Sequence, residues 1–213
     1  MELARYRYIV VEGPIGVGKT SLTHKLARAL SAQTLLEQPE ENPFLEKFYR
    51  DAASYALPTQ MFFLFQRMNQ LRDLTQTDLF DAPIVSDFLL DKDPIFASLT
   101  LADDELNLYR QMYDHLRPQA PQPDLVIYLQ ADPAVLAERV KKRAIAMESN
   151  ISETYLYRLC ESYSRYFHHY DAAPLLIVNA ETLNPIDKED DFQLLLSRIR
   201  NMRGKREFFK LGE

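Results

Sequence analysis

The chain has 213 residues, of which 46% are hydrophobic and 26% are charged, and its formal net charge is −6 at pH 7. This length suits one α/β domain with a full core and excludes two ordinary domains joined by a linker. The negative charge argues against nucleic acid or anionic membranes as partners, and no apolar run approaches the length of a membrane span. Cys160 is the single cysteine, which excludes an internal disulfide, and the first residues lack a secretory signal, so we expect a cytoplasmic protein.

The first predicted strand, at about 6–11, leads into a phosphate-binding loop, and an amphipathic helix is predicted behind it at about 19–31. Backbone N–H groups of such a loop, together with the N-terminus of the next helix, bind phosphate. Lys19 would reach the β- and γ-phosphates, and the Thr20 hydroxyl would ligate Mg²⁺. The chain is therefore expected to bind a nucleoside triphosphate with Mg²⁺. The complete G-x-x-x-x-G-K-T motif reads Gly13, Pro14, Ile15, Gly16, Val17, Gly18, Lys19, Thr20.

The remaining elements alternate between helices and apolar strands. Strands that are continuous apolar runs, alternating with helices, indicate a parallel sheet buried on both faces. We expect one domain over 1–213 with the P-loop NTPase fold: a five-stranded parallel sheet flanked by helices, with a helical lid and a tail at 204–213 that is mobile or lies on the surface. The predicted strands are 34–37, 83–87, 123–129 and 175–178, and the predicted helices are about 43–49 (capped by Asn42), 58–76, 93–100, 103–116, one from Asp132-Pro133, 152–170 (capped by Ser152) and 188–203.

Two carboxylates stand where predicted strands end. Glu37 ends the second strand and Asp87 ends the third. Ligands of open parallel sheets bind beyond these carboxyl ends, and phosphoryl transfer needs a carboxylate that takes the acceptor's proton. We predict Glu37 as the general base and Asp87 as a direct or water-mediated Mg²⁺ ligand beside Thr20. The sequence leaves open whether Asp87 serves the metal or the acceptor hydroxyl.

A polar stripe interrupts the most apolar predicted helix. Gln60 and Arg67 lie two turns apart on one side of it, with Phe63 between them. Burying an amide and a guanidinium without partners costs several kcal/mol, so something must satisfy them. A nucleobase would do so, since it offers donors, acceptors and a flat face. The alternative is an internal salt bridge, for example between Arg67 and Asp93.

Basic residues cluster where the helix after the fourth strand ends. Cations at this position are ordinary partners of the helix dipole. In a phosphate-binding enzyme they also suit a lid that brings positive charge over the transferred group, here at about 139–152. The cluster consists of Arg139, Lys141, Lys142 and Arg143, and Arg139 and Arg143 share one helix face.

Taken together, these motifs resemble the deoxyribonucleoside kinases, in particular the bacterial deoxyadenosine/deoxyguanosine kinase branch, over about residues 8–170. The phosphate-binding loop alone is shared with many families, whereas the series from Glu37 to Arg67 is more specific. The matching pieces are residues 12–20, Glu37 with 41–45 and 48–49, 60–67, 87–96, and 127–129 leading into Arg139 and Arg143.

The resemblance implies ATP as phosphoryl donor, Mg²⁺, a homodimer, and roles for individual residues. Arg139 and Arg143 would be lid arginines, and the loop at about 184–190 would hold the adenine of ATP. The residues implied to hold the nucleoside are Glu37 on the 5′-hydroxyl, Tyr49 and Glu148 on the 3′-hydroxyl, and Gln60, Arg67 and Asp93 on the base.

One position departs from the family. Its third strand usually ends in Asp-Arg-Ser or Glu-Arg-Ser, and here it reads Asp87-Phe88-Leu89. The arginine that would touch the phosphates and the base carboxylate is absent, and Lys92 or an arginine elsewhere would have to replace it. Ile145 likewise stands where relatives often carry a third lid arginine.

The expected function is transfer of the ATP γ-phosphoryl group to the 5′-hydroxyl of a deoxynucleoside, with purines favoured. One alternative is a nucleoside monophosphate kinase of the thymidylate kinase type. Its acceptor phosphate needs extra cations, but the acceptor side here offers only Arg67. The other alternative is a degenerate nucleotide-binding regulatory protein. A GTPase is not favoured, because the chain has no Asn-Lys-x-Asp motif.

Overall fold

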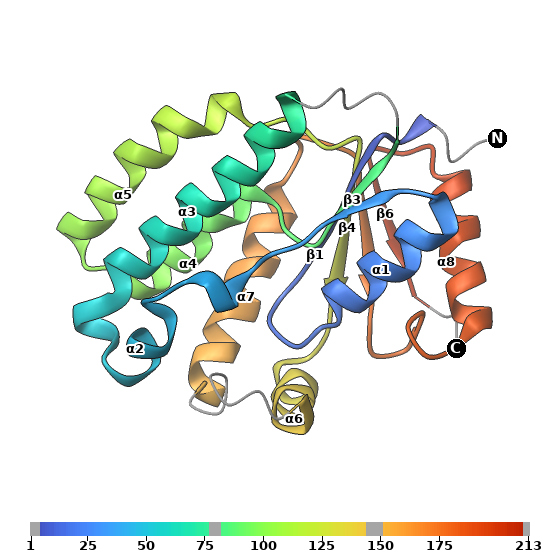
Figure 1. The fold of residues 1–213 in the computed structure, drawn as a ribbon. Coiled ribbons are helices and arrows are strands. Elements are labelled where there is room, and N and C mark those ends of the chain that lie inside the picture. The colour runs from blue at the N-terminus through green and yellow to red at the C-terminus, as the bar shows by residue number, and fades with distance from the viewer. Residues whose placement is uncertain (1–4, 77–81, 144–150, 211–213) are drawn as a thin grey trace.

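The structure, a computed structural model, describes residues 5–76, 82–143 and 151–210. Within these residues the strands form one parallel sheet in the order β2-β3-β1-β4-β5-β6 (Figure 1). The P-loop NTPase architecture predicted from the sequence, with a parallel sheet between helices, is confirmed. The strands are β1 Tyr8–Glu12, β2 Gln33–Leu35, β3 Ile84–Ser86, β4 Leu125–Gln130, β5 Leu175–Asn179 and β6 Arg206–Phe209.

The prediction of five strands is wrong by one. Residues 206–209, expected to belong to a mobile or surface-lying tail, form β6 and pair in parallel with β5. The Leu175 N–H donates to Lys205 O over 2.9 Å, so the pairing begins just before β6. Arg206 fixes the strand further, since its guanidinium donates to His168 O and Tyr170 O over 2.6 and 2.5 Å. These partners are distant in sequence, and the segment itself has no strand pattern.

Helices cover both faces of the sheet. In Figure 1, α1 and α8 lie on one side of it and α3, α4, α5 and α7 on the other. The alternation of neighbouring strand residues produces two core clusters, because Ile9 packs into one and Val10 into the other. The helices are α1 Lys19–Leu30, α2 Leu45–Arg50, α3 Ala52–Gln76, α4 Asp93–Thr100, α5 Asp103–Leu116, α6 Pro133–Arg143, α7 Glu153–His169 and α8 Glu189–Asn201.

Most predicted helix boundaries are confirmed within a few residues, and α3 is the main exception. It begins at Ala52, so Pro58 lies inside the helix and not at its start. The additional turns bury Ala56 against Leu45 and Phe48 of α2, and this packing outweighs the local preference of proline for a first turn. None of the helices in the described ranges has the length and hydropathy needed to span a bilayer.

The strand order brings the functional loops to one edge. β1 lies between β3 and β4, and the phosphate-binding loop follows it. Glu37 comes two residues after β2, and Asp87 directly follows β3. Because parallel strands all end at the same edge, both carboxylates approach the phosphate-binding loop there.

Candidate active site

The phosphate-binding loop is held tightly on two sides. Gly16 and Gly18 have φ of 83° and 100°, values that favour glycine. A Cβ at Gly16 would lie 2.8 Å from Val140 of α6, and one at Gly18 would lie 2.6 Å from Ile186. The Lys19 ammonium donates to the loop carbonyls of Gly13 and Pro14 over 2.9 and 3.3 Å. The loop is therefore a preformed cradle whose lysine is held by its own backbone.

Asp87 joins the loop to the predicted base. Its Oδ2 accepts the Thr20 hydroxyl over 2.6 Å, and its Oδ1 accepts the backbone N–H of Glu37 over 2.8 Å. The residue is 3% exposed. One buried carboxylate thus sets the position of Thr20 and Glu37 relative to each other.

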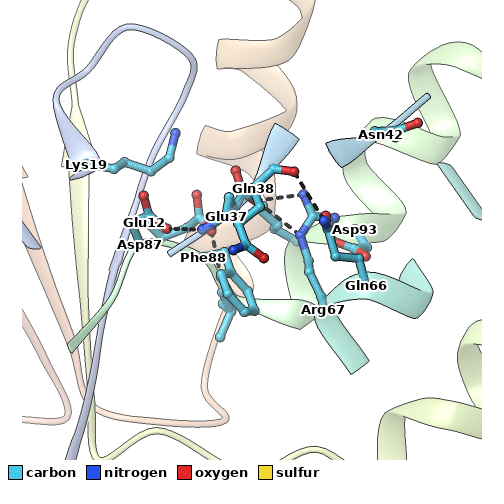
Figure 2. Close-up of polar contacts among 12 residues, drawn as sticks. Glu12, Lys19, Glu37, Gln38, Asn42, Gln66, Arg67, Asp87, Phe88 and Asp93 are labelled. Atoms are coloured by element: carbon cyan, nitrogen blue, oxygen red, sulfur yellow. Dashed lines mark hydrogen bonds and ion pairs between the residues drawn. The ribbon is translucent and has the colours of Figure 1, made fainter. Parts of the chain in front are cut away.

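Two cations hold the Glu37 carboxylate, as Figure 2 shows for Arg67. Arg67 donates to Oε1 through Nε and Nη2 over 3.1 and 2.6 Å, and Lys92 donates to the same oxygen over 2.7 Å. Burial opposes ionisation of Glu37, but the charges of Lys92, Arg67 and Lys19 outweigh it and lower its pKa well below the usual value. Glu37 is therefore ionised at neutral pH.

Glutamines of α3 hold the backbone on both sides of Glu37. Gln70 donates to Leu36 O over 3.0 Å, and Gln66 donates to Gln38 O over 3.1 Å. Sequence reasoning missed both glutamines. Their i, i+4 spacing beside Arg67 places them on one helix face, but only the folded structure shows what they bind.

Glu12 is a third residue that sequence reasoning missed. It is fully buried and accepts hydrogen bonds from Gly13 N (2.8 Å), Leu89 N (2.9 Å) and the Tyr163 hydroxyl (3.1 Å). Lys92 Nζ lies 3.4 Å from its Oε2. An acidic residue at the end of an otherwise apolar strand was the available signal.

Position 88 carries no charge into the site. Phe88 is fully buried in the core cluster that includes Leu64 and Tyr109. The 3-10 turn over Leu90–Lys92 brings Lys92 to Glu37 instead. Lys92, one of the replacements considered from the sequence for the absent arginine, contacts the predicted base, and so does Arg67.

A cavity of about 290 Å³ opens beside Glu37. Asp93 lies behind Arg67, outside the cavity lining, and accepts from Arg67 Nη1 over 2.5 Å. The internal salt bridge considered as an alternative therefore exists, although Arg67 also lines the cavity. Gln60 donates to the Thr100 hydroxyl over 3.4 Å. The predicted site residues brought together in this lining are Ile15, Gly16, Lys19, Thr20, Glu37, Tyr49, Gln60, Phe63, Arg67, Asp87 and Arg143.

A second cavity, of about 280 Å³, lies on the other side of the loop. Its lining combines residues 16–18 with 184–187, the loop predicted to hold adenine. Arg139 and Lys142 line this cavity, and Arg139 donates to Ala180 O over 2.9 Å. The two predicted lid arginines are thus divided between the cavities, with Arg143 in the first.

The remaining residues discussed for the lid are Lys141, Ile145 and Glu148. Lys141 forms an exposed ion pair with Glu153 over 2.8 Å and lines neither cavity. Glu148, predicted on the sugar hydroxyl, and Ile145 lie outside the described residues.

Comparison with known proteins finds similarity to nucleoside kinases. The model of the deoxynucleoside kinase family matches residues 9–202. Deoxyguanosine kinase of Bacillus subtilis (strain 168) is 30% identical over 200 residues, covering 92% of this chain and 97% of the relative. Deoxyadenosine/deoxycytidine kinase of the same organism is 29% identical over 204 residues, covering 91% and 92%. A solved structure of deoxyadenosine kinase from M. mycoides, with the products dCMP and a flexible dCDP bound, matches with a TM-score of 0.81 and 26% identity, covering 92% of this chain and all of that one.

Proposed function

Because this chain belongs to the deoxynucleoside kinase family, we propose that the two cavities beside its phosphate-binding loop hold the two substrates of one transfer. The enzyme transfers the γ-phosphoryl group of ATP to the 5′-hydroxyl of a deoxynucleoside, with a purine deoxynucleoside as the favoured acceptor. The nucleoside occupies the cavity of Glu37, and the adenine of ATP occupies the cavity lined by 184–187. The supporting observation is that Gly16 borders both cavities, so the loop lies between donor and acceptor.

Glu37 acts as the general base and Lys19 as the phosphate-binding cation. Glu37 is ionised at neutral pH because Lys92, Arg67 and Lys19 outweigh the effect of burial on its pKa. Lys19 bonds to carbonyls of its own loop, and phosphate oxygens can replace these acceptors. Phosphoryl transfer depends mainly on such positioning and charge neutralisation, which the preformed loop and the fixed carboxylate provide.

Thr20 and Asp87 are the residues that would hold Mg²⁺. Their oxygens lie 2.6 Å apart, and hydroxyl and carboxylate oxygens are the donors that Mg²⁺ prefers. Among the described residues no group of three or more acidic, histidine or cysteine side chains could form a metal site of its own. This fits Mg²⁺, which usually combines one or two protein ligands with waters and substrate phosphates. When bound, the ion neutralises charge that develops on the phosphate oxygens.

Gln60 and Arg67 recognise the base. Asp93 lies behind Arg67, and Phe63 lies beside Arg67. Arg67 lies over the Phe63 ring at 5.0 Å and bonds to Asp93, so its orientation is fixed before a base arrives. The Gln60 amide keeps an acceptor oxygen for an exocyclic amino group or ring N–H, since its bond to Thr100 uses only Nε2. Tyr49 lines the same cavity and is assigned to the sugar, together with Glu148.

Charge on the acceptor side favours a neutral nucleoside over a nucleoside monophosphate. The acceptor side offers Lys92 in addition to Arg67, the one cation expected there from the sequence, and both are bound to carboxylates. An acceptor phosphate would have to displace these contacts and approach Glu37, a like charge. Arg143 and Arg139 are assigned to the transferred phosphoryl group and to ATP, respectively.

A homodimer in the cytoplasm is the proposed form of the enzyme. Phe65 of α3 and Leu108 of α5 are 42% and 51% exposed, and these two helices pack beside each other on one side of the sheet (Figure 1). Exposed apolar side chains on adjacent helices suit a subunit contact. Cys160 as the single cysteine is consistent with a reducing compartment. Sedimentation velocity should give twice the chain mass of 24.8 kDa.

A product analysis tests the proposed function. Deoxyadenosine, deoxyguanosine, deoxycytidine and thymidine are incubated separately with the protein, ATP and Mg²⁺, and the products are separated by chromatography. We expect a nucleoside 5′-monophosphate with ADP, formed fastest from a purine. A diphosphate formed only from added monophosphates would instead identify a nucleoside monophosphate kinase, and binding without ADP formation would identify a regulatory protein.

A further inference from the structure

Lys92 bridges two carboxylates in the interior of the site. Its ammonium lies 2.7 Å from Glu37 Oε1 and 3.4 Å from Glu12 Oε2, and the residue is 1% exposed. A buried ammonium is costly unless it is paired. Glu12 and Glu37 provide that pairing, and they raise the pKa of Lys92 despite the opposing effect of burial. Lys92 is therefore a fixed positive charge at the base.

Glu12 is the immobile end of this bridge. Its Oε2 also accepts the Leu89 N–H, and its Oε1 accepts the N–H of Gly13 and the Tyr163 hydroxyl. Gly13 is the first residue of the phosphate-binding loop. One buried carboxylate thus binds both the start of the loop and the cation that holds Glu37.

The side-chain hydrogen bonds to the Glu37 carboxylate reach only one of its two oxygens among the described residues. Arg67 Nε, Arg67 Nη2 and Lys92 Nζ all donate to Oε1, and no donor from the described residues reaches Oε2. The Glu37 side chain is 22% exposed and lines the cavity of about 290 Å³. Figure 2 shows Glu37 with Glu12 on one side and Arg67 on the other. Oε2 is the oxygen left for an incoming hydroxyl.

We propose that Lys92, anchored by Glu12, is a positioning residue that turns Oε2 of Glu37 toward the cavity as the proton-accepting oxygen and ties the base to the phosphate-binding loop. The inference rests on the proposed function. In the transfer, the 5′-hydroxyl oxygen forms a bond to the γ-phosphorus as its proton passes to Oε2. The bond between that phosphorus and ADP breaks, and its electron pair leaves with ADP.

Removing the charge of Lys92 is the test. In Lys92→Met, kcat should fall by about 10- to 100-fold, the cost of a base displaced by about 1 Å, whereas the affinities for nucleoside and ATP, measured by calorimetry, should change by about threefold or less. Lys92→Arg should give a kcat between those of Lys92→Met and wild type. Lys205→Met, an exposed lysine before β6, is the matched control and should retain wild-type kcat.

The pH dependence of kcat separates positioning from a purely structural ion pair. The charged groups facing Glu37 are Lys92, Arg67 and Lys19, with Asp87 at its backbone and Asp93 behind Arg67. Among the charges that lower the pKa of Glu37, that of Lys92 has the largest effect. In Lys92→Met the pKa of Glu37 should rise, so the acid limb of the pH profile of kcat should move to higher pH. Lys205→Met should leave that limb in place.

A second variant covers the case in which Lys92→Met leaves Glu12 as an unpaired buried charge and unfolds. In the double variant Glu12→Gln/Lys92→Met the pair is neutral, so the fold should be retained and kcat should still fall. The inference is overturned if the double variant, or a Lys92→Met protein that folds, keeps kcat within twofold of wild type and an unmoved acid limb. The proposed function would be unaffected by that result. If the wild-type protein phosphorylates no deoxynucleoside, the proposed function itself fails.

Discussion

The hydroxyl of Thr20 donates to Asp87 Oδ2 over 2.6 Å, which joins the first turn of α1 to the end of β3. Both side chains line the cavity that also holds Glu37. Since Asp87 also accepts the Glu37 backbone N–H, the proposed metal ligands and the base share one support.

Substituting Asp87 should therefore change the response to metal. In Asp87→Asn, the Mg²⁺ concentration for half-maximal activity should rise by about tenfold or more, because a carboxylate ligand becomes a neutral amide. Nucleoside affinity, measured without metal, should stay near that of wild type. Asp103→Asn, on the exposed first turn of α5, is the control and should keep the wild-type Mg²⁺ response. An unchanged Mg²⁺ response in Asp87→Asn would remove Asp87 from the metal site.

Gln60 should set base preference without setting the rate of chemistry. In Gln60→Leu, the amide proposed to face the base is lost. A base that it hydrogen-bonds should then lose about 1–3 kcal/mol of binding, or roughly 5- to 150-fold in kcat/KM. The ranking of the four deoxynucleosides should change, whereas kcat for the best one should change less than its KM. Gln193→Leu, on the exposed face of α8, is the matched control. The same ranking in Gln60→Leu and wild type would contradict base reading by Gln60.

Gln70 should act on the rate through the backbone beside Glu37. In Gln70→Ala, the bond to Leu36 O is lost and the segment carrying Glu37 loosens, so kcat should fall by about tenfold while ATP affinity stays constant. The comparison with Gln193→Ala shows whether the effect is specific. If KM for ATP changed as much as kcat, the glutamine would be supporting the whole site and not the base.

Asp93 should make stability depend on pH. Burial, only partly offset by the charges of Arg67 and Lys92, raises its pKa to about 6, and its Oδ2 is buried without a hydrogen-bond partner among the described residues. The folded state therefore holds this proton more tightly than the unfolded state. The contribution of Asp93 is fully present below its usual pKa and is lost as pH rises through about 6.

Urea unfolding of wild type and Asp93→Asn between pH 7.5 and about 3 measures this contribution. The free energy of unfolding of wild type should gain up to about 3 kcal/mol relative to Asp93→Asn on going from above pH 6 to below pH 4. Glu37 should not obscure the effect. Because its pKa is lowered, its own contribution is lost progressively as pH falls below its usual pKa, but both proteins carry Glu37 and this loss cancels in the difference. Parallel curves for the two proteins would show that folding does not raise the pKa of Asp93.

Residues whose position follows from a local motif could be placed from the sequence. The phosphate-binding loop carries its own glycines. Glu37 and Asp87, predicted as the last residues of their strands, come two residues and one residue after β2 and β3, which parallel pairing brings to one edge. Arg67 was recognised as a buried charge in need of partners, and it has two, Glu37 and Asp93. The fold class followed from the alternation of apolar strands and helices.

Features that depend on distant contacts were not predictable. The residues 206–209 become a strand only because β5 presents an unpaired edge to them. Glu12 is a buried acid whose partners come from the start of the phosphate-binding loop, from α7 and from the turn after β3, and no local sequence pattern predicts that set of partners. The division of Arg139 and Arg143 between two cavities reflects how α6 packs against the phosphate-binding loop, which helical periodicity alone does not contain.

The single-turnover rate of phosphoryl transfer in Glu37→Gln tests the central claim most directly. Glutamine keeps an oxygen for Arg67 and Lys92 but is a poor proton acceptor, so the rate should fall by about 10²- to 10⁴-fold. Nucleoside affinity should largely survive, and Glu46→Gln on the exposed face of α2 should behave as wild type. A Glu37→Gln enzyme that transfers phosphate at the wild-type rate would contradict the account.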